Sequence, residues 1–511
     1  MNLTLSLAIN GGTGTTKKRK LLRDSVVVDD VMSCDGGDHH SRVVRLLQAS
    51  ERMMAKLEVD DPRVAAAAPD DGGGGLRLMH LLLSSVAAAE SGDAHAVAAA
   101  LHEVYRRASF RGGDPEQRVA AYFADALTSS RLVRSSWSSP AAAAAAPPTR
   151  AERFLAYTMF YQASPIYQLA HFTANQAIVE AFESGGRRRL HVVDFDVSYG
   201  FQWPSLIQSL SHAAASTSPT TSSSSHDCDG DGDCAEPVSL RITGFGKNPD
   251  ELRQTEARLA RFASGCPNLR FEFEGIVDDD GPDSGRRHER IKVDDDATVV
   301  VNLVFPAAAA QSSTTSSARE EACTALARIR SLNPSLVFLV EKDGGGGGGG
   351  NATSRGRRSS VLPPFTASLR YFAAVFDSLH ECLPADSAER LAIERNHLGT
   401  EISDAMASLA DYNNNYGGGD DDHMAEPTTT SWKQMMERAG FERVELSSRT
   451  VSQAKLLLKM KSGGCGGGGG FRVMEGEGGR AMSLAWRDRA QLITATGWRR
   501  RPRSINKQAF S

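Results

Sequence analysis

The sequence has no excess of basic charge and few aromatic residues. Its 511 residues include 58 lysines and arginines against 62 aspartates and glutamates, which gives a formal net charge of -4, and aromatic residues make up 7%. A protein that binds nucleic acid through its overall charge is basic. Any contact with DNA must therefore come from local basic clusters or from a partner protein.

Cysteines and long apolar runs are also scarce. The seven cysteines are odd in number and irregularly spaced, which favours a reducing compartment over a disulfide framework. The opening segment MNLTLSLAIN is short and lacks a basic start, and no run of 18 apolar residues follows it. We therefore expect no export signal and no membrane span, and a location in the cytosol or nucleus.

Basic residues cluster at both ends of the chain. The first cluster consists of Lys17, Lys18, Arg19 and Lys20, and the second of Arg499, Arg500, Arg501 and Arg503. A nuclear import receptor could bind the first cluster in a polar tail, although a solvated charge run has the same composition.

Composition and periodicity divide the chain into four segments. Residues 1–75 lack lasting periodicity and are expected to form a disordered tail, with one short helix at 43–57. Residues 76–185 are predicted to form an α-helical cap and leucine-rich region, 186–498 an α/β core with inserts rich in Ser, Gly and Asp, and 499–511 a basic tail.

Three features of the helical segment predict packing. Leu81, Leu82 and Leu83 on its first helix suit a core and a partner interface equally well. The aromatic residues of 151–164, among them Phe154, Tyr157 and Phe160, recur at helical spacing and are expected in the core. Asn175 and Gln176 lie in the middle of an apolar helix, so we expect them to meet exposed backbone or another polar element.

After Gly185-Gly186, strands alternate with helices, which is typical of βαβ units and a mainly parallel, doubly wound sheet of the methyltransferase type. The expected strands are 190–195, 239–245, 269–276, 297–305, 334–342, 443–448 and 453–460. Pro204 suits the first turn of the helix after the first strand.

The cofactor motif of such methyltransferases is incomplete. The first strand ends at Asp194, but of three expected glycines only Gly200 is present, and Asp196 occupies the first position. The second strand ends in Thr243 to Gly246, without the acid that would hold a ribose. The pair Asp194 and Asp196 could bind a metal, but acceptance of backbone hydrogen bonds by Asp194 is the simpler interpretation.

Other catalytic or metal motifs are absent or incomplete. Residues 227–238 match the first half of an EF-hand, but Val238 stands where a bidentate glutamate is needed, so we interpret them as an acidic insert. The chain contains no phosphate loop, nucleophile elbow or zinc-binding HExxH motif. The sequence therefore predicts no catalytic residues, no metal and no cofactor.

Three groups of residues carry a family resemblance. The first is the box of His191, Val192, Val193, Asp194, Gly200, Gln202, Trp203 and Pro204. The second, of the PFYRE type, contains Pro364, Phe365, Tyr371, Phe372, Glu394 and Arg395, and the third, of the SAW type, contains Trp432, Gly440, Phe441, Trp486 and Trp498. With these groups the chain resembles the GRAS family of plant transcriptional regulators, in its SCARECROW-like branch.

The resemblance implies a nuclear transcriptional regulator with a methyltransferase-like core and a helical cap. Such a protein is not an enzyme, acts through contacts with other GRAS proteins and transcription factors, and forms homodimers or heterodimers. Direct binding to promoter DNA stays open. The alternatives are an S-adenosylmethionine-dependent small-molecule methyltransferase and a receptor that uses the former cofactor pocket.

Overall fold

The computed structural model describes residues 74–133, 146–217, 237–266, 268–278, 291–306, 326–343, 360–384, 386–416, 432–462, 470–487 and 490–501. The basic cluster Lys17 to Lys20, the helix expected at 43–57 and most of the acidic insert lie outside these ranges.

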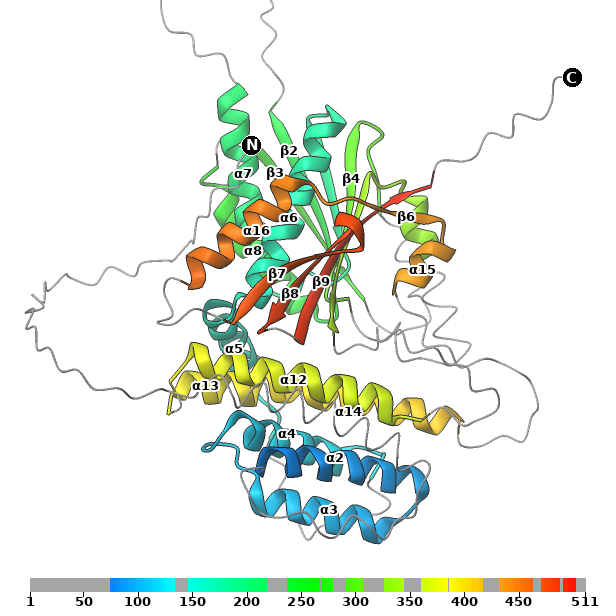
Figure 1. Ribbon diagram of the computed structural model, residues 1–511. Coiled ribbons are helices and arrows are strands. Elements are labelled where there is room, and N and C mark those ends of the chain that lie inside the picture. Colours follow the sequence, from blue (N-terminus) through cyan, green and yellow to red (C-terminus); the bar gives the residue numbers. More distant parts are fainter. Residues whose placement is uncertain are drawn as a thin grey trace, which may run out of the picture.

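A nine-stranded sheet forms the centre of the molecule (Figure 1). Its strands are β1 (Arg189–Asp194), β2 (Val238–Gly246), β3 (Leu269–Val277), β4 (Ala297–Val304), β5 (Leu336–Lys342), β6 (Phe441–Val444), β7 (Phe471–Gly476), β8 (Ala481–Trp486) and β9 (Ala490–Arg500). Their order is β3-β2-β1-β4-β5-β9-β8-β7, with β6 beside β9. The first five strands are parallel and β9 is antiparallel to β5, which confirms the predicted α/β class.

Helices cover both faces of this sheet. Four pack on the face that contains Leu190 and Val192: α6 (Pro165–Gly185), α7 (Trp203–Thr217), α8 (Pro249–Ala263) and α16 (Ser448–Ser462). The opposite face, with Val193, is covered by α15 (Trp432–Arg438). Because both faces are covered, β4 is buried along its whole length.

The cap lies beyond one end of the sheet (Figure 1). It combines early helices with later ones: α2 (Gly74–Ser91), α3 (Ala94–Arg107) and α4 (Pro115–Ser129) pack with α12 (Leu362–Cys382), α13 (Ala388–Ile393) and α14 (Gly399–Tyr416), and α5 (Arg150–Ala163) lies between cap and sheet. The break between α2 and α3 is capped by Asp93, whose carboxylate accepts hydrogen bonds from two backbone amides of α3. Leu82 and Leu83 are buried, so they belong to the core of this cap.

The C-terminal strands differ from the prediction. Residues 453–460 were expected as a strand but lie in helix α16, where Val451, Ala454, Leu457 and Leu458 recur at helical spacing and are buried. The sequence prediction also missed β7, β8 and β9. Short turns interrupt the apolar alternation of these strands, so their antiparallel pairing was not recognised in the sequence. Among the described helices, none has the length and apolar character to cross a bilayer.

Candidate functional site

The box residues of the first strand serve mainly in packing. Val192 and Val193 are fully buried on opposite faces of the sheet, and His191 Nε2 lies 2.9 Å from the Thr243 hydroxyl of β2. Trp203 begins α7 and is buried, with Pro204 next to it in the first turn. These side chains hold the sheet and its first crossover helix in place.

A polar network joins the carboxyl ends of β1 and β4. Asn302 Nδ2 donates to Asp194 Oδ1 over 3.1 Å, and Gln202 Nε2 donates to Asn302 Oδ1 over 3.1 Å. Asn175 of α6 donates to the backbone carbonyl of Gln202 over 2.8 Å. This contact confirms the expectation that Asn175 meets exposed backbone, and it fixes the turn after β1 against α6.

Asp194 is buried within this network. It is 2% exposed. Burial raises the pKa of its carboxyl to about 7, although the hydrogen bond from Asn302 opposes that shift. The amide of Asp196 lies 3.4 Å from Asp194 Oδ1, in agreement with the backbone-accepting role.

The turn after β1 does not form a glycine cradle. Gly200 has φ +70°, and a Cβ there would lie 2.7 Å from the Thr255 side chain, so this glycine allows the turn to pack on α8. The other two glycine positions are taken by Asp196 and Ser198. At the end of β2, Phe245 stacks on Phe195 with ring centroids 5.1 Å apart, where a ribose-binding acid would be needed.

A cavity of about 260 Å³ lies at the carboxyl ends of β1, β4 and β5. Its lining comes from the cap side and α6 (Tyr157, Tyr167, His171, His397, Glu401), from the turn after β1 (Asp194, Asp196, Val197, Ser198, Tyr199, Phe201, Gln202) and from the ends of β4 and β5 (Val304, Phe305, Lys342). None of these lining residues belongs to β2 or β3. Phe160 is buried as expected, whereas Tyr157 of the same stripe faces the cavity.

A charged group that sequence reasoning missed lies in the cavity wall. Lys342 Nζ is 2.7 Å from Glu401 Oε1, and the Tyr167 hydroxyl donates to the same carboxylate over 2.8 Å. Burial raises the pKa of Glu401, but the positive charge of Lys342 and the hydrogen bonds from Lys342 and Tyr167 are among the contributions that together outweigh burial and leave the pKa at about 2. The sequence signal was Lys342 itself, a charged residue at the carboxyl end of an apolar parallel strand.

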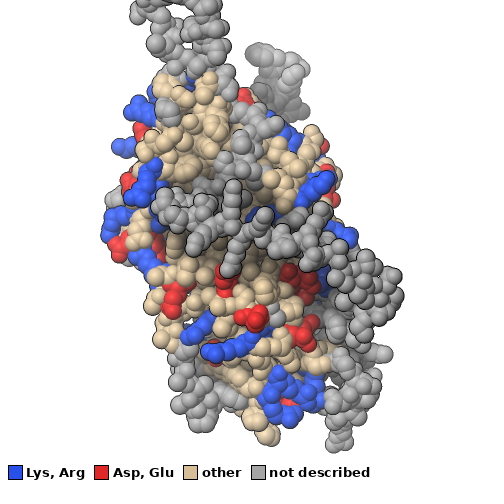
Figure 2. Space-filling model, turned by 90° about the vertical axis from the view of Figure 1, so that its left-hand side faces the viewer, with Lys and Arg blue, Asp and Glu red and all other residues tan. Residues whose placement is uncertain are grey.

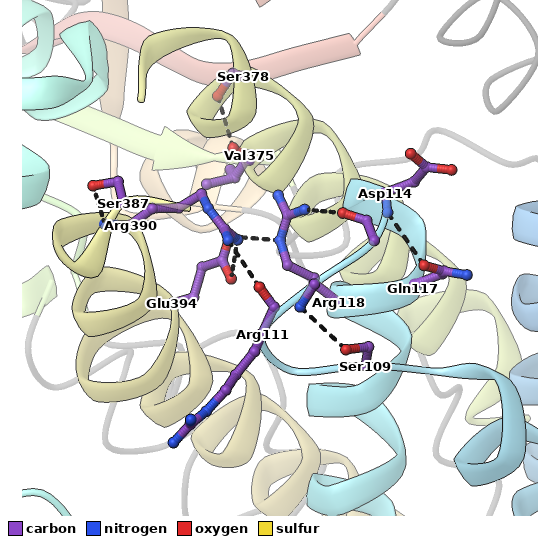
Figure 3. Close-up of polar contacts among 12 residues, drawn as sticks. Ser109, Arg111, Asp114, Gln117, Arg118, Val375, Ser378, Ser387, Arg390 and Glu394 are labelled. Atoms are coloured by element: carbon purple, nitrogen blue, oxygen red, sulfur yellow. Dashed lines mark hydrogen bonds and ion pairs between the residues drawn. The ribbon is translucent and has the colours of Figure 1, made fainter. Parts of the chain in front are cut away.

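Glu394 of the PFYRE-type group forms a second charged group, inside the cap (Figure 3). Arg118 Nε of α4 lies 3.0 Å from Glu394 Oε1, and Arg390 Nη1 lies 2.9 Å from the same oxygen. Arg118 and Glu394 side chains are 0% exposed. Arg118 and Arg390 also donate to backbone carbonyls of the 111–113 loop. The cluster therefore ties α4 to α13, whereas the neighbouring Arg395 is exposed.

A short π-helix, Glu394–Leu398, connects the two charged groups. In an uninterrupted α-helix, residues seven positions apart lie on nearly the same face. Here Glu394 contacts the cap helix α4, whereas Glu401 contacts Lys342 at the end of β5. The wider π turn rotates the helix, so that Glu394 points to the cap and Glu401 points to the end of β5.

The remaining PFYRE-type aromatics pack α12 on α4. Phe365 and Phe372 meet Phe123 edge to face, with centroids 5.6 and 5.9 Å apart. Tyr371 is buried beside Phe372, and Pro364 lies in the first turn of α12.

The SAW-type residues lie elsewhere, around the sheet. Trp432, Phe441 and Trp498 are buried together on the α15 face. Gly440 has φ +83° and approaches the Arg330 guanidinium closely. Trp486 of β8 donates its indole hydrogen to Asp377 of α12 over 2.6 Å. The three family groups thus occupy three places, and only the box contributes to the cavity.

No metal site emerges from the described residues. No group of three or more His, Cys, Asp or Glu side chains among them could hold an ion. Among these residues, no third His, Cys, Asp or Glu joins Asp194 and Asp196 as a metal ligand. Two carboxylates alone bind a metal ion weakly.

Comparison with known proteins identifies the family. The model of the GRAS domain family matches residues 78–499. Scarecrow-like protein 23 of Arabidopsis thaliana is 31% identical over 79% of this chain and 84% of its own length. Scarecrow-like protein 28 of the same plant is 31% identical over 79% of this chain and 55% of its own, and the DELLA protein GAIP of Cucurbita maxima is 30% identical over 75% and 56%.

The chain thus spans about half the length of two of these three relatives. Among solved structures, SCL7 from Oryza sativa is similar with a TM-score of 0.59 and 30% identity, over 85% of this chain and all of that one. On these matches, the chain belongs to the GRAS domain family of plant transcriptional regulators.

Proposed function

We propose that this protein acts in the nucleus as a transcriptional regulator that reaches promoters through other proteins, GRAS proteins and transcription factors among them, as a homodimer or heterodimer. The observation that carries the proposal lies at the carboxyl end of the sheet. The fold is of the methyltransferase type, but the turn that would hold the cofactor packs against the neighbouring helix instead. In this proposal Asp194 and Gln202 stabilise the turn and have no role in chemistry.

The position of the cavity supports a protein without methyltransferase activity. In doubly wound sheets of this kind, the cofactor ribose is held at the end of the second strand. Of the strands, β1, β4 and β5 contribute to the described lining and β2 does not, and Phe245 stands directly before Gly246, the last residue of β2. S-Adenosylmethionine-dependent methyl transfer, the alternative, lacks both the glycine cradle and the ribose acid.

The surface supports contact with promoters through partners. On the face shown in Figure 2, acidic and basic side chains of the described residues are interspersed instead of forming one basic surface. Arg189 lies 3.4 Å from Asp296, and Arg499 lies 2.7 Å from Glu442. Arginines that already pair with carboxylates contribute less to phosphate binding. Direct DNA binding would have to come from elsewhere.

Promoter occupancy with and without partners tests the proposal. We expect the full chain, expressed in plant cells, to enter nuclei and to be crosslinked to chromatin, and the purified chain alone to shift no duplex at 50 mM salt. A variant with Lys17, Lys18, Arg19 and Lys20 changed to alanine should lose nuclear enrichment. Alanines at the exposed Arg253 and Arg261 of α8 provide the control. Exclusion of the intact chain from nuclei, or tight salt-dependent binding of DNA by the chain alone, would overturn it.

A further inference from the structure

The cavity carries more negative than positive charge. Its lining contains three carboxylates, of Asp194, Asp196 and Glu401, and one ammonium, of Lys342. Lys342 is committed to Glu401 at 2.7 Å. Burial lowers the pKa of the two lining histidines, His171 to about 3, so neither adds positive charge at neutral pH. At least one carboxylate of the lining therefore has no positive charge within the lining to neutralise it.

Asp196 is the carboxylate that a ligand can reach. Its side chain is accessible although protein atoms surround it, because it opens into the cavity. Among the described residues, its carboxylate accepts a hydrogen bond from the Ser198 amide, over 3.1 Å. Lys247, from outside the lining, and Lys342, within it, attract the carboxylate without a hydrogen bond to it among these residues. Asp196 thus retains acceptor capacity that faces the cavity.

His171 also belongs to the cavity lining. His171 is 9% exposed and lines the cavity, and its Nδ1 atom has no hydrogen-bond partner among the described residues. Buried polar atoms without partners are rare in folded proteins and call for one. This nitrogen is itself closed off from the cavity, so the imidazole contributes only its ring, uncharged at neutral pH, to the wall.

Aromatic rings form much of the remaining wall. Tyr157 packs against Tyr199 and Phe201 with centroids 5.0 and 5.3 Å apart, and Phe305 lies across the cavity lining at the end of β4. Lys342 Nζ already lies 5.2 Å from the Phe305 ring centre, so this wall accommodates a cation. Ring faces attract cations through their quadrupole.

We infer that the cavity binds a small organic cation, a protonated amine that carries a compact apolar or aromatic group. Its ammonium group would donate to Asp196. Its apolar part would lie against Tyr157, Tyr199 and Phe201. This inference goes beyond the proposed regulatory function, and its failure would leave that function untouched, because promoter occupancy is measured separately.

Calorimetric titration of the full chain with three ligands of similar shape tests the inference. The probes are 2-phenylethylamine, a cation at pH 7, 2-phenylethanol, which is neutral, and phenylacetate, an anion. We expect saturable binding of the amine, binding of the alcohol weaker by about tenfold or more, and no binding of the acid. S-Adenosylmethionine should give no saturable heat, since no residue of β2 lines the cavity.

Two variants separate recognition from folding. Asp196→Asn should weaken the amine by about tenfold and leave the alcohol unchanged, whereas Asp295→Asn, at an exposed carboxylate at the opposite edge of the sheet, should change neither. Thermal unfolding of both variants checks that they fold. Equal affinity for amine and alcohol, no saturable amine binding, or an amine affinity that survives Asp196→Asn in a folded protein would each overturn the inference.

Discussion

Glu394 and Glu401 lie on one continuous helical segment, and each pairs with basic side chains, but their surroundings differ. Glu394 is 0% exposed and meets two arginines inside the cap. The Glu401 side chain is 24% exposed and meets one lysine beside a cavity. In the cap no ligand can reach the charges, so they can only stabilise; beside the cavity, similar charges are open to a ligand.

The largest expected effect comes from Glu394→Gln. The change leaves two guanidinium groups buried without a counter-charge, so we expect the free energy of unfolding to fall by about 3 to 5 kcal/mol. Urea denaturation of the full chain measures it. Glu442→Gln, which breaks an exposed pair with Arg499, is the control and should cost less than about 1 kcal/mol. Equal losses in the free energy of unfolding for the two variants would contradict the expected difference between buried and exposed ion pairs.

Glu401→Gln should have an intermediate effect, a loss of about 2 kcal/mol near pH 7, because a partly exposed ion pair is lost and water can reach Lys342. The folded pKa of Glu401, about 2, lies below its ordinary value of 4.5. Its contribution is therefore fully present above about pH 4.5 and is lost as the pH falls towards 2. The gap between variant and parent should narrow from pH 6 to pH 3 in urea titrations; a constant gap would contradict the assignment.

Asp194→Asn should give the smallest change and the opposite sign. Its folded pKa, about 7, lies above the ordinary 3.8, so its ionisation costs stability progressively as the pH rises from about 4 to 7. The asparagine can still accept from Asn302 and carries no charge. We expect the variant to exceed the parent by about 1 to 2 kcal/mol at pH 8 and to match it at pH 4. A variant less stable than the parent at pH 8 would show that Asp194 needs its charge.

Much of the fold could be predicted because its signals are local. Apolar runs bounded by glycine and proline defined β1 to β5, and the helical spacing and capping residues of 76–132 defined the first cap helices. The prediction of the closing strands was wrong because the apolar run at 453–460 suits either a strand or one face of a helix. That choice depends on what packs against it, which is α6 here.

The site divides in the same way. The residues of the turn after β1 were visible from sequence, because a parallel sheet brings its carboxyl ends to one edge. The cavity wall was not, since Tyr157 comes from α5, whereas His397 and Glu401 come from a much later helical segment that a π turn orients.

By itself, the sequence determined the class of sheet, the loss of the glycine cradle and the family, because all three depend on short contiguous patterns. The tertiary structure alone decided that Glu394 is sealed between α4 and α13 while Glu401 faces a cavity beside Lys342. The physical reason is burial. A glutamate that distant side chains shield from water can only stabilise the fold, whereas one that remains open to a cavity can also contact a ligand.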